Sequence, residues 1–141
     1  MNSNIIVKEF NNKTVEFLKQ ALILCERMDN NAVKAVDIVN IEMLNSVEPD
    51  FILKLYIKHM MKYKDKIDNY DHSFLDKFDI KSINFGDLRL TVISKYLTFM
   101  KLFKKLNADN KRILFDYLQL FCGLSLKYAE INILKVSNQS I

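Results

Sequence analysis

Apolar residues recur at intervals of three or four along most of the chain, the spacing that gathers side chains on one face of an α-helix. The first helix is predicted to begin near Asn11 or Asn12, because either amide side chain can cap exposed backbone N–H groups. Its apolar stripe consists of Val15, Leu18, Leu22 and Cys25. A second, shorter helix is predicted after the polar turn at residues 29–31. Its stripe includes Val33, Ala35, Val36, Val39 and Met43.

The middle of the chain predicts a third helix and then a region of turns. Residues 48–50 read Glu-Pro-Asp, and proline suits the first helical turn, where acidic side chains face the positive end of the helix dipole. The apolar stripe weakens beyond Tyr63, and residues 68–86 are rich in turn formers. Within them we expect Asp71 to act as a cap, with Phe74 and Leu75 anchoring the turn to the core.

Two strong helical patterns, at residues 87–106 and 109–134, are separated by a short polar turn, which favours antiparallel neighbours. Only two Gly and one Pro occur, too few for the tight turns of an all-β fold. The sequence therefore predicts a single all-α domain over residues 1–141. We expect a compact bundle of about five helices with a C-terminal helical hairpin, and loosely ordered ends at 1–10 and 136–141.

Cysteine usage and the N-terminal residues bear on the compartment. Cys25 and Cys122 both lie inside apolar patterns, which predicts two buried thiols. The sequence contains no CxxC or HxxxH pair, the spacings typical of zinc ligands. The N-terminal residues lack the charged and apolar regions of a secretory signal. No apolar run approaches the roughly 18 residues that a membrane span requires. We therefore expect an intracellular protein that is not secreted and does not span a membrane.

The residues that carry most enzymatic chemistry are few. His59 falls on the inner face of the third helix, where a hydrogen-bonded imidazole is the usual outcome. His72 stands between Asp71 and Ser73, and three consecutive side chains cannot converge as a catalytic triad. The aspartates of residues 65–79 lack the spacing and the glycine of a calcium loop, and no Gly-rich phosphate loop occurs. The sequence therefore predicts a protein that is not an enzyme and has no metal or cofactor.

Charge is distributed unevenly along the chain. Residues 1–50 carry five Lys/Arg and eight Asp/Glu, whereas residues 51–141 carry sixteen and nine. A basic half can contact phosphates, but only three arginines occur and no nucleic-acid-binding motif is visible. Any such binding is expected to be sequence-nonspecific, and a solvated lysine face is the simpler alternative. The candidate nucleic-acid face consists of Lys54, Lys58, Lys62, Lys101, Lys105 and Arg112.

A protein partner is the other hypothesis. The chain contains six Met, six Tyr and ten Phe, types that are enriched in interface cores, although flexible Met also fills helical cores. Met60 and Met61 are adjacent, so both cannot face one core, and Met61 is expected near the surface. The candidate partner surface is Met61, Lys62, Lys64 and Lys66, with Lys54 and Lys58 beside it.

Two segments resemble a family of small helical proteins found in nucleocytoplasmic large DNA viruses. The first, YIKHMMKYKDKIDNYDHSFL at residues 56–75, contains the family's Tyr-Lys-x-x-Ile-x-x-x-Asp-x-x-Phe pattern. The matching residues are Tyr63, Lys64, Ile67, Asp71 and Phe74. The second, FKKLNADNKRILFDYLQLFCGLSLKYA at residues 103–129, is similar to the family's C-terminal hairpin through Lys111, Ile113, Tyr117 and Leu118. Phe115 stands where the family commonly has tryptophan.

The resemblance implies a viral origin and an all-α fold, and it transfers no catalytic residue because the family has no established activity. We therefore expect a non-enzymatic protein–protein interaction module of a large DNA virus, host-interacting or virion-associated. Its partner is expected to be a viral or host protein, in the infected-cell cytoplasm or the virion. The alternative is an accessory nucleic-acid-binding protein that uses the lysine-rich face. A second copy of the chain also stays open as a partner.

Overall fold

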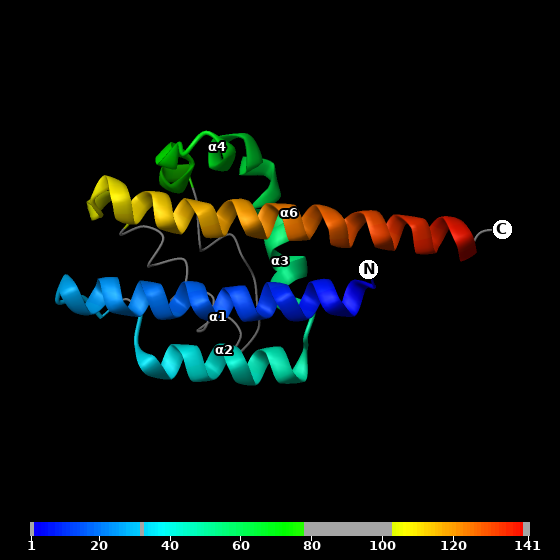
Figure 1. Cartoon of the computed structure of the whole chain (residues 1–141), viewed down its shortest axis with the longest axis horizontal. Coiled ribbons are helices and arrows are strands. Elements are labelled where there is room, and N and C mark those ends of the chain that lie inside the picture. Colours follow the sequence, from blue (N-terminus) through cyan, green and yellow to red (C-terminus); the bar gives the residue numbers. More distant parts are fainter. Residues whose placement is uncertain (1, 32, 78–102, 140–141) are drawn as a thin grey trace.

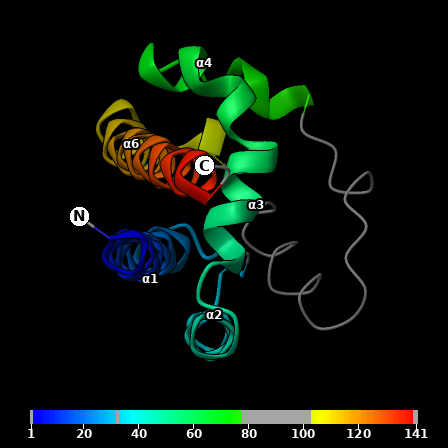
Figure 2. The same cartoon turned by 90° about the vertical axis from the view of Figure 1, so that its right-hand side faces the viewer.

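The computed structural model describes residues 2–31, 33–77 and 103–139. Within these residues every regular element is helical, so the predicted all-α class is confirmed. The long helices are α1 (Ser3–Arg27) and α6 (Ala108–Gln139), which run antiparallel side by side (Figure 1). Helix α2 (Ala35–Val47) returns along the other side of α1, and α3 (Phe51–His59) crosses between the layers (Figures 1 and 2).

Short helical turns complete the described chain. They are η1 (Met61–Tyr63), α4 (Lys64–Asp68), η2 (His72–Lys77) and η4 (Phe103–Lys105). Of the predicted hairpin, α6 supplies the second arm, whereas most of the first arm, predicted at 87–106, lies outside the described residues. In Figure 1 the elements stack in the order α4, α6, α1 and α2, so α2 forms the outer layer on one side.

Helix α1 begins eight residues before its predicted start. Asn2 is the actual cap: its Oδ1 accepts the backbone N–H of Asn4 at 2.7 Å and of Ile5 at 3.3 Å. Ile6 and Phe10 are buried, so the prediction that residues 1–10 are loosely ordered was wrong. The apolar pattern of residues 5–10 was overlooked because two asparagines at 11 and 12 suggested a cap.

The predicted loose C-terminal end, residues 136–141, is described as far as Gln139. Residues 136–141 were expected to be loosely held, yet α6 continues as a regular helix to Gln139. The six residues carry no apolar stripe, so sequence pattern alone gave no reason to extend the helix.

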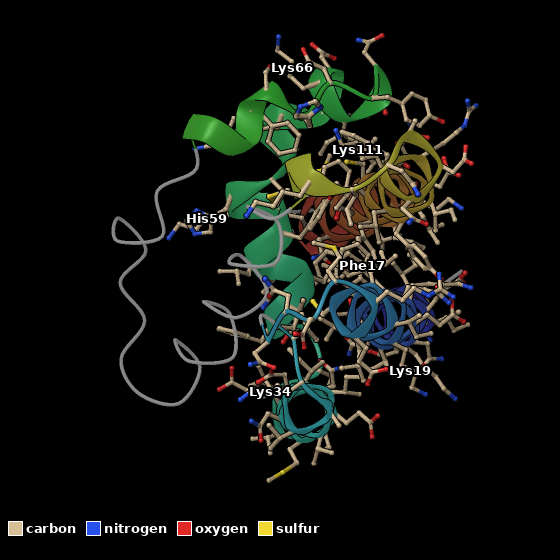
Figure 3. The ribbon with its side chains drawn as sticks, turned by 90° about the vertical axis from the view of Figure 1, so that its left-hand side faces the viewer. Phe17, Lys19, Lys34, His59, Lys66 and Lys111 are labelled. Atoms are coloured by element: carbon tan, nitrogen blue, oxygen red, sulfur yellow. The ribbon has the colours of Figure 1, made fainter. Side chains whose placement is uncertain are left out.

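Aromatic rings from three helices form the centre of the core. Phe121 of α6 lies 4.9 Å from the ring centre of Phe10, 6.0 Å from that of Phe17 and 5.6 Å from that of Tyr56. Phe17 lies between α1 and α6 (Figure 3). The Tyr56 hydroxyl donates to the carbonyl oxygen of Leu118 at 2.9 Å, which satisfies the one polar atom of the cluster.

Tyr70 follows α4 and contacts α6, although its backbone adopts a left-handed conformation that is unfavourable for tyrosine. Its φ is 55°, which costs a residue with a side chain roughly 1–2 kcal/mol. The N–H groups of residues 70 and 71 donate to the carbonyls of residues 67 and 66, the pattern of a Schellman helix end that usually holds glycine. The tyrosine contacts α6 instead: its ring packs edge-on against Phe115 at 5.6 Å, and its hydroxyl donates to Asp116 at 3.1 Å.

The predicted capping role of Asp71 is confirmed. Its Oδ1 accepts the backbone N–H of Ser73 at 2.9 Å, at the start of η2, and Lys66 Nζ lies 3.2 Å from Oδ2. These hydrogen bonds, first those from Ser73 and then that from Lys66, lower the pKa of Asp71 to about 2. Phe74 is buried, as predicted, whereas the side chain of Leu75 lies outside the described part.

Asp71→Ala is therefore expected to destabilise the fold at neutral pH. The folded-state pKa of about 2 lies below the ordinary value of 3.8, so the ionised carboxylate contributes stability above pH 3.8 and loses it as pH falls toward 2. In urea unfolding, the difference between wild type and variant should be constant at pH 7 and 5 and should shrink at pH 3. Asp65→Ala, on the exposed side of α4, is the control. A difference independent of pH would contradict the capping carboxylate.

Candidate functional site

Helix α2 presents an apolar stripe to solvent. Its exposed side chains are Val36, Val39, Met43 and Val47, which are 57%, 54%, 60% and 77% exposed. Their spacing of three, four and four residues places them on one face, opposite the buried Ile38 and Ile41. Four large apolar side chains in a row on a 13-residue helix are an unusual surface, and we call them the α2 stripe.

The sequence-based assignment of the buried face of α2 was wrong. Val36, Val39 and Met43 were expected to face the core with Val33, but only Val33, which precedes the helix, is buried. The helix is apolar on two sides, so periodicity alone offered two choices. Asp37 helps fix the actual orientation, because its buried carboxylate accepts the backbone N–H of Lys34 at 2.9 Å.

The two faces of α2 are expected to respond differently to truncation. Ile41→Ala should lower the free energy of unfolding by about 2–5 kcal/mol, because it leaves a cavity against α1. Val39→Ala, two residues away on the exposed face, should change it by less than about 0.5 kcal/mol. Urea denaturation of the two variants measures both effects. Equal losses would show that the stripe is buried and that the assignment of its face is wrong.

The partner surface predicted from sequence lies on η1 and α4. Met61 is half-buried against the core, and Lys62 is exposed. Lys64 and Lys66 each pair with an aspartate four or five residues further along, at 2.5 and 3.2 Å. The hydrogen bond that Lys64 donates to Asp68 also raises the pKa of Lys64. These four residues follow one another along η1 and α4, but Lys64 and Lys66 already pair with aspartates.

The candidate nucleic-acid face is spread over several elements. Lys54 of α3 pairs with Asp50 at 2.7 Å, and the Arg112 guanidinium of α6 lies 5.0 Å from the ring centre of Tyr70. Lys101 lies outside the described residues. The remaining three are exposed: Lys58, Lys62 and Lys105. Two residues of the predicted basic face, Lys54 and Arg112, therefore already interact with other residues of this protein.

Other basic side chains are distributed over both ends of the layer stack. Lys66 and Lys111 lie around α4 and the beginning of α6, whereas Lys19 and Lys34 lie around α1 and α2 (Figure 3). This arrangement gives the described part of the molecule several small basic areas. It gives no reason to extend the predicted nucleic-acid face beyond the residues already named.

The two cysteine side chains are buried, and both histidines are half-buried. His59 is half-buried, and burial followed by the charges of Lys58 and Lys62 lowers its pKa. Cys25 and Cys122 are free and buried, as predicted, and burial raises the pKa of both thiols. In the described part of the chain, no three His, Cys, Asp or Glu side chains gather as metal ligands. No helix among the described residues is both long and apolar enough to cross a membrane.

A groove lined by both polar and apolar side chains runs along the seam between α1 and α2. It consists of two hollows of about 340 and 440 Å³ that share Asn11, Asn12 and Asn45. Asn11 is only 9% exposed, and its Nδ2 donates to the carbonyl oxygen of Pro49 at 2.7 Å. The Oδ1 atoms of Asn11 and Asn45 are buried and have no hydrogen-bond partner in the described structure.

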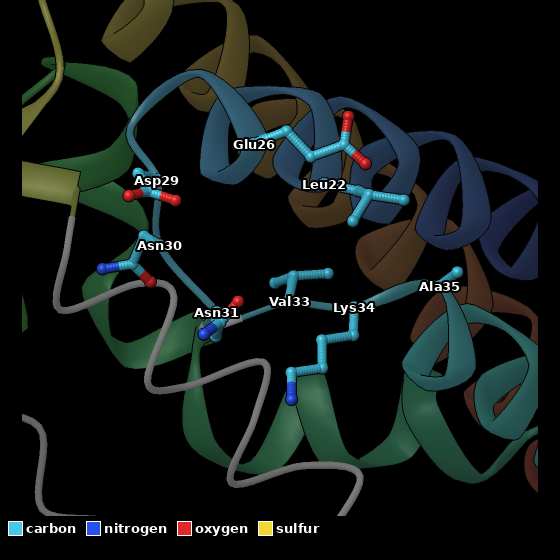
Figure 4. Close-up of a pocket in the computed structure, with 8 residues that line it drawn as sticks. All are labelled: Leu22, Glu26, Asp29, Asn30, Asn31, Val33, Lys34 and Ala35. Atoms are coloured by element: carbon cyan, nitrogen blue, oxygen red, sulfur yellow. The ribbon is translucent and has the colours of Figure 1, made fainter.

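A smaller hollow of about 310 Å³ lies beside the turn between α1 and α2 (Figure 4). The side chains of Glu26, Asp29 and Asn31 surround it together with Lys34 (Figure 4). Of its lining residues only Val33 is buried, so it is an open depression on an exposed turn. Sequence reasoning singled out neither this hollow nor the asparagine groove, because asparagines in a helical pattern are usually solvent-exposed.

Comparisons with models of known protein families, with curated proteins and with solved structures gave no match. The function must therefore be argued from the surface of the protein itself.

Proposed function

We propose that this chain is a non-enzymatic protein–protein interaction module that docks through the α2 stripe. The observation that carries the proposal is the row of four exposed apolar side chains on the outer layer of the bundle. Exposed apolar rows of this kind mark binding surfaces, because a helix in a monomeric protein normally turns its polar face to water.

The occupant of the stripe is a partner protein with an apolar groove. From Val36 to Val47 the stripe is about 16 Å long, given the rise of about 1.5 Å per residue. Two such stripes laid against each other would bury well under the roughly 800 Å² per partner of a stable complex. A groove covers a helix on three sides and buries more of it per unit length, which favours helix-in-groove docking over a second copy.

The charged residues of α2 indicate which residues should border the partner's groove. Between Ala35 and Val47 the helix carries no basic residue, and its exposed acid is Glu42, because Asp37 is buried. Glu48 follows the end of the helix, and Asp50 pairs with Lys54 at 2.7 Å. The first 50 residues have three more acidic than basic side chains. A basic rim would complement this surface and speed association. The partner is therefore a protein whose apolar groove is bordered by Lys or Arg.

The setting of this interaction follows the sequence resemblance. The pattern around Tyr63 and Asp71 is similar to a segment of small helical proteins of large DNA viruses. On that basis the chain belongs to such a virus and acts on a viral or host protein, in the infected cell or in the virion. The geometry of the α2 stripe is compatible with either partner.

Site-specific photo-cross-linking tests the proposal. A photoreactive amino acid at position 43 should cross-link one protein, which is then identified, purified and shown to bind the chain. The same probe at Ile23, an exposed apolar position on α1, is the matched control and should not cross-link it. A cross-link that forms from position 23 but not from 43 would remove the α2 stripe as the docking surface.

Two solution measurements test the two alternative partners, a second copy of the chain and a nucleic acid. Sedimentation velocity should show a monomer at about 100 μM, whereas a dimer lost in Val39→Glu would assign the stripe to a second copy. Fluorescence anisotropy with duplex DNA and single-stranded RNA tests the lysine-rich face. Micromolar binding that collapses between about 50 and 200 mM salt, and weakens in Lys58→Glu with Lys62→Glu, would favour nucleic-acid binding instead.

A further inference from the structure

Helix α2 buries few of its side chains against the rest of the molecule. Of its 13 residues three are buried, Asp37, Ile38 and Ile41, whereas ten residues of α1 are buried. The four side chains of the α2 stripe face water, so they add nothing to the attachment of the helix in the free protein. Few buried apolar contacts are typical of the parts of a protein that open first.

The seam between α1 and α2 is more open to water than the centre of the core. Helices α1, α3 and α6 meet through the buried rings of Phe10, Tyr56 and Phe121, whose centres lie 5.8, 4.9 and 5.6 Å apart in pairs. Helix α2 contains no aromatic residue, and hollows of about 340 and 440 Å³ lie along its seam with α1. A third hollow, of about 310 Å³, lies beside the turn that leads into α2 (Figure 4).

The sequence of α2 does not favour a helix that stands alone. Nine of its 13 residues are Val, Ile, Asn, Asp or Ser, which have lower helix propensity than Ala, Leu, Glu and Met. Isolated helices shorter than about 12–15 residues are marginal in water even for favourable sequences. The helical structure of α2 therefore depends on its packing against α1, and a segment that separates from α1 unwinds.

We propose that α2 separates from α1 as a unit while the core of α1, α3 and α6 stays folded, and that the partner's groove binds the segment in this state. Separation exposes Ile38 and Ile41, which lie opposite the α2 stripe, so the groove can bury both apolar faces as the helix re-forms. The capture step rests on the proposed function, whereas the separation is a property of the free protein.

Native-state hydrogen exchange of the free protein tests the separation. The backbone amides of residues 39–47, which donate within α2, should share one protection factor, at least about 100-fold below that of the slowest amides of α6. That shared value should fall at low concentrations of guanidinium chloride, because separation exposes buried surface. Protection equal to that of α6 would overturn the proposal. Values that decline toward the helix ends and do not depend on denaturant would also overturn it, because that is the pattern of fraying.

Two truncations distinguish separation of α2 from global unfolding. Leu114→Ala removes a fully buried side chain of α6, so it should lower the protection of α6 at least about tenfold and leave that of residues 39–47 unchanged. Leu22→Ala removes a half-buried side chain of α1 that lines the same hollow as Val33, just before α2 (Figure 4). It should lower both protection factors equally, by at least about fivefold, because it weakens only the packed state. If Leu114→Ala also lowered both equally, α2 would open only when the whole protein unfolds.

The same two variants test capture by the protein that is cross-linked from position 43. If its groove binds the separated segment, Leu22→Ala should tighten binding by the factor by which it lowers the protection of α2, because a larger fraction of molecules is ready to bind. Leu114→Ala should leave the dissociation constant unchanged. Calorimetry that shows no tightening in Leu22→Ala would mean that the partner binds α2 while it is packed on α1, and would reject capture.

Two combined outcomes keep the proposals apart. Separation of α2 in hydrogen exchange, together with no cross-link from position 43, would retain the separation and reject docking through the α2 stripe. A cross-link from position 43, together with equal protection in α2 and α6, would retain the docking and reject the separation.

Discussion

Phe121→Ala is expected to lower the free energy of unfolding by about 3–5 kcal/mol. The Phe121 ring is buried and contacts rings from α1 and α3, at 4.9 Å from Phe10 and 5.6 Å from Tyr56. Its removal leaves a cavity where three helices meet and also ends the ring–ring contacts. Because domains of this size are stable by only about 5–15 kcal/mol, the variant should be close to unfolded at 37 °C.

Urea denaturation followed by circular dichroism measures this loss. Leu120→Ala is the matched control, since Leu120 is the neighbouring residue on the exposed side of α6. The control should change the free energy of unfolding by less than about 0.5 kcal/mol. Similar losses in both variants would mean that α6 does not bury the face described here.

The double variant Val39→Glu with Met43→Glu is expected to weaken partner binding at least about a hundredfold. Both side chains lie at the centre of the α2 stripe, and each truncated hot-spot residue typically costs 2 kcal/mol or more. Two carboxylates placed in an apolar groove add the cost of burying unpaired charge. Stability should hardly change, because both positions are exposed in the free protein.

The measurement is isothermal titration calorimetry with the purified protein identified by cross-linking. Ile23→Glu is the matched control, because it places one carboxylate on an exposed apolar position away from α2. That variant should bind within about twofold of wild type. Unchanged binding of the double variant would remove the stripe from the interface, and a large loss of stability would show that the two side chains are buried.

The sequence predicted the helices with strong one-sided stripes and missed features that depend on three-dimensional packing. The helical stretch of α6 was predicted correctly from its local pattern. A helix was also predicted at the start of α3, but Pro49 precedes that helix instead of standing in its first turn. At the N-terminus, Asn2 and Asn11 are both acceptable caps by residue type. Only the burial of Ile6 and Phe10 against neighbouring helices decides that the helix begins at Ser3.

In the candidate site, too, local sequence patterns could be read, whereas features that depend on packing could not. The ion pairs of Lys54 and Lys64 were not predicted, although the four-residue spacing to their aspartate partners allows them to be read from the sequence. The α2 stripe was not, because a helix apolar on two sides has no unique buried face by periodicity. Asn45 also gave no signal, since its orphaned carbonyl depends on where α1 lies.

If α2 is the docking element, hydrogen–deuterium exchange on the reconstituted complex should show slower amide exchange in residues 35–47 than in the free protein. Residues 59–71, where the sequence predicted the partner surface, should show no change. Slower exchange in residues 59–71 with α2 unaffected would contradict it and would return the interface to Met61, Lys62, Lys64 and Lys66.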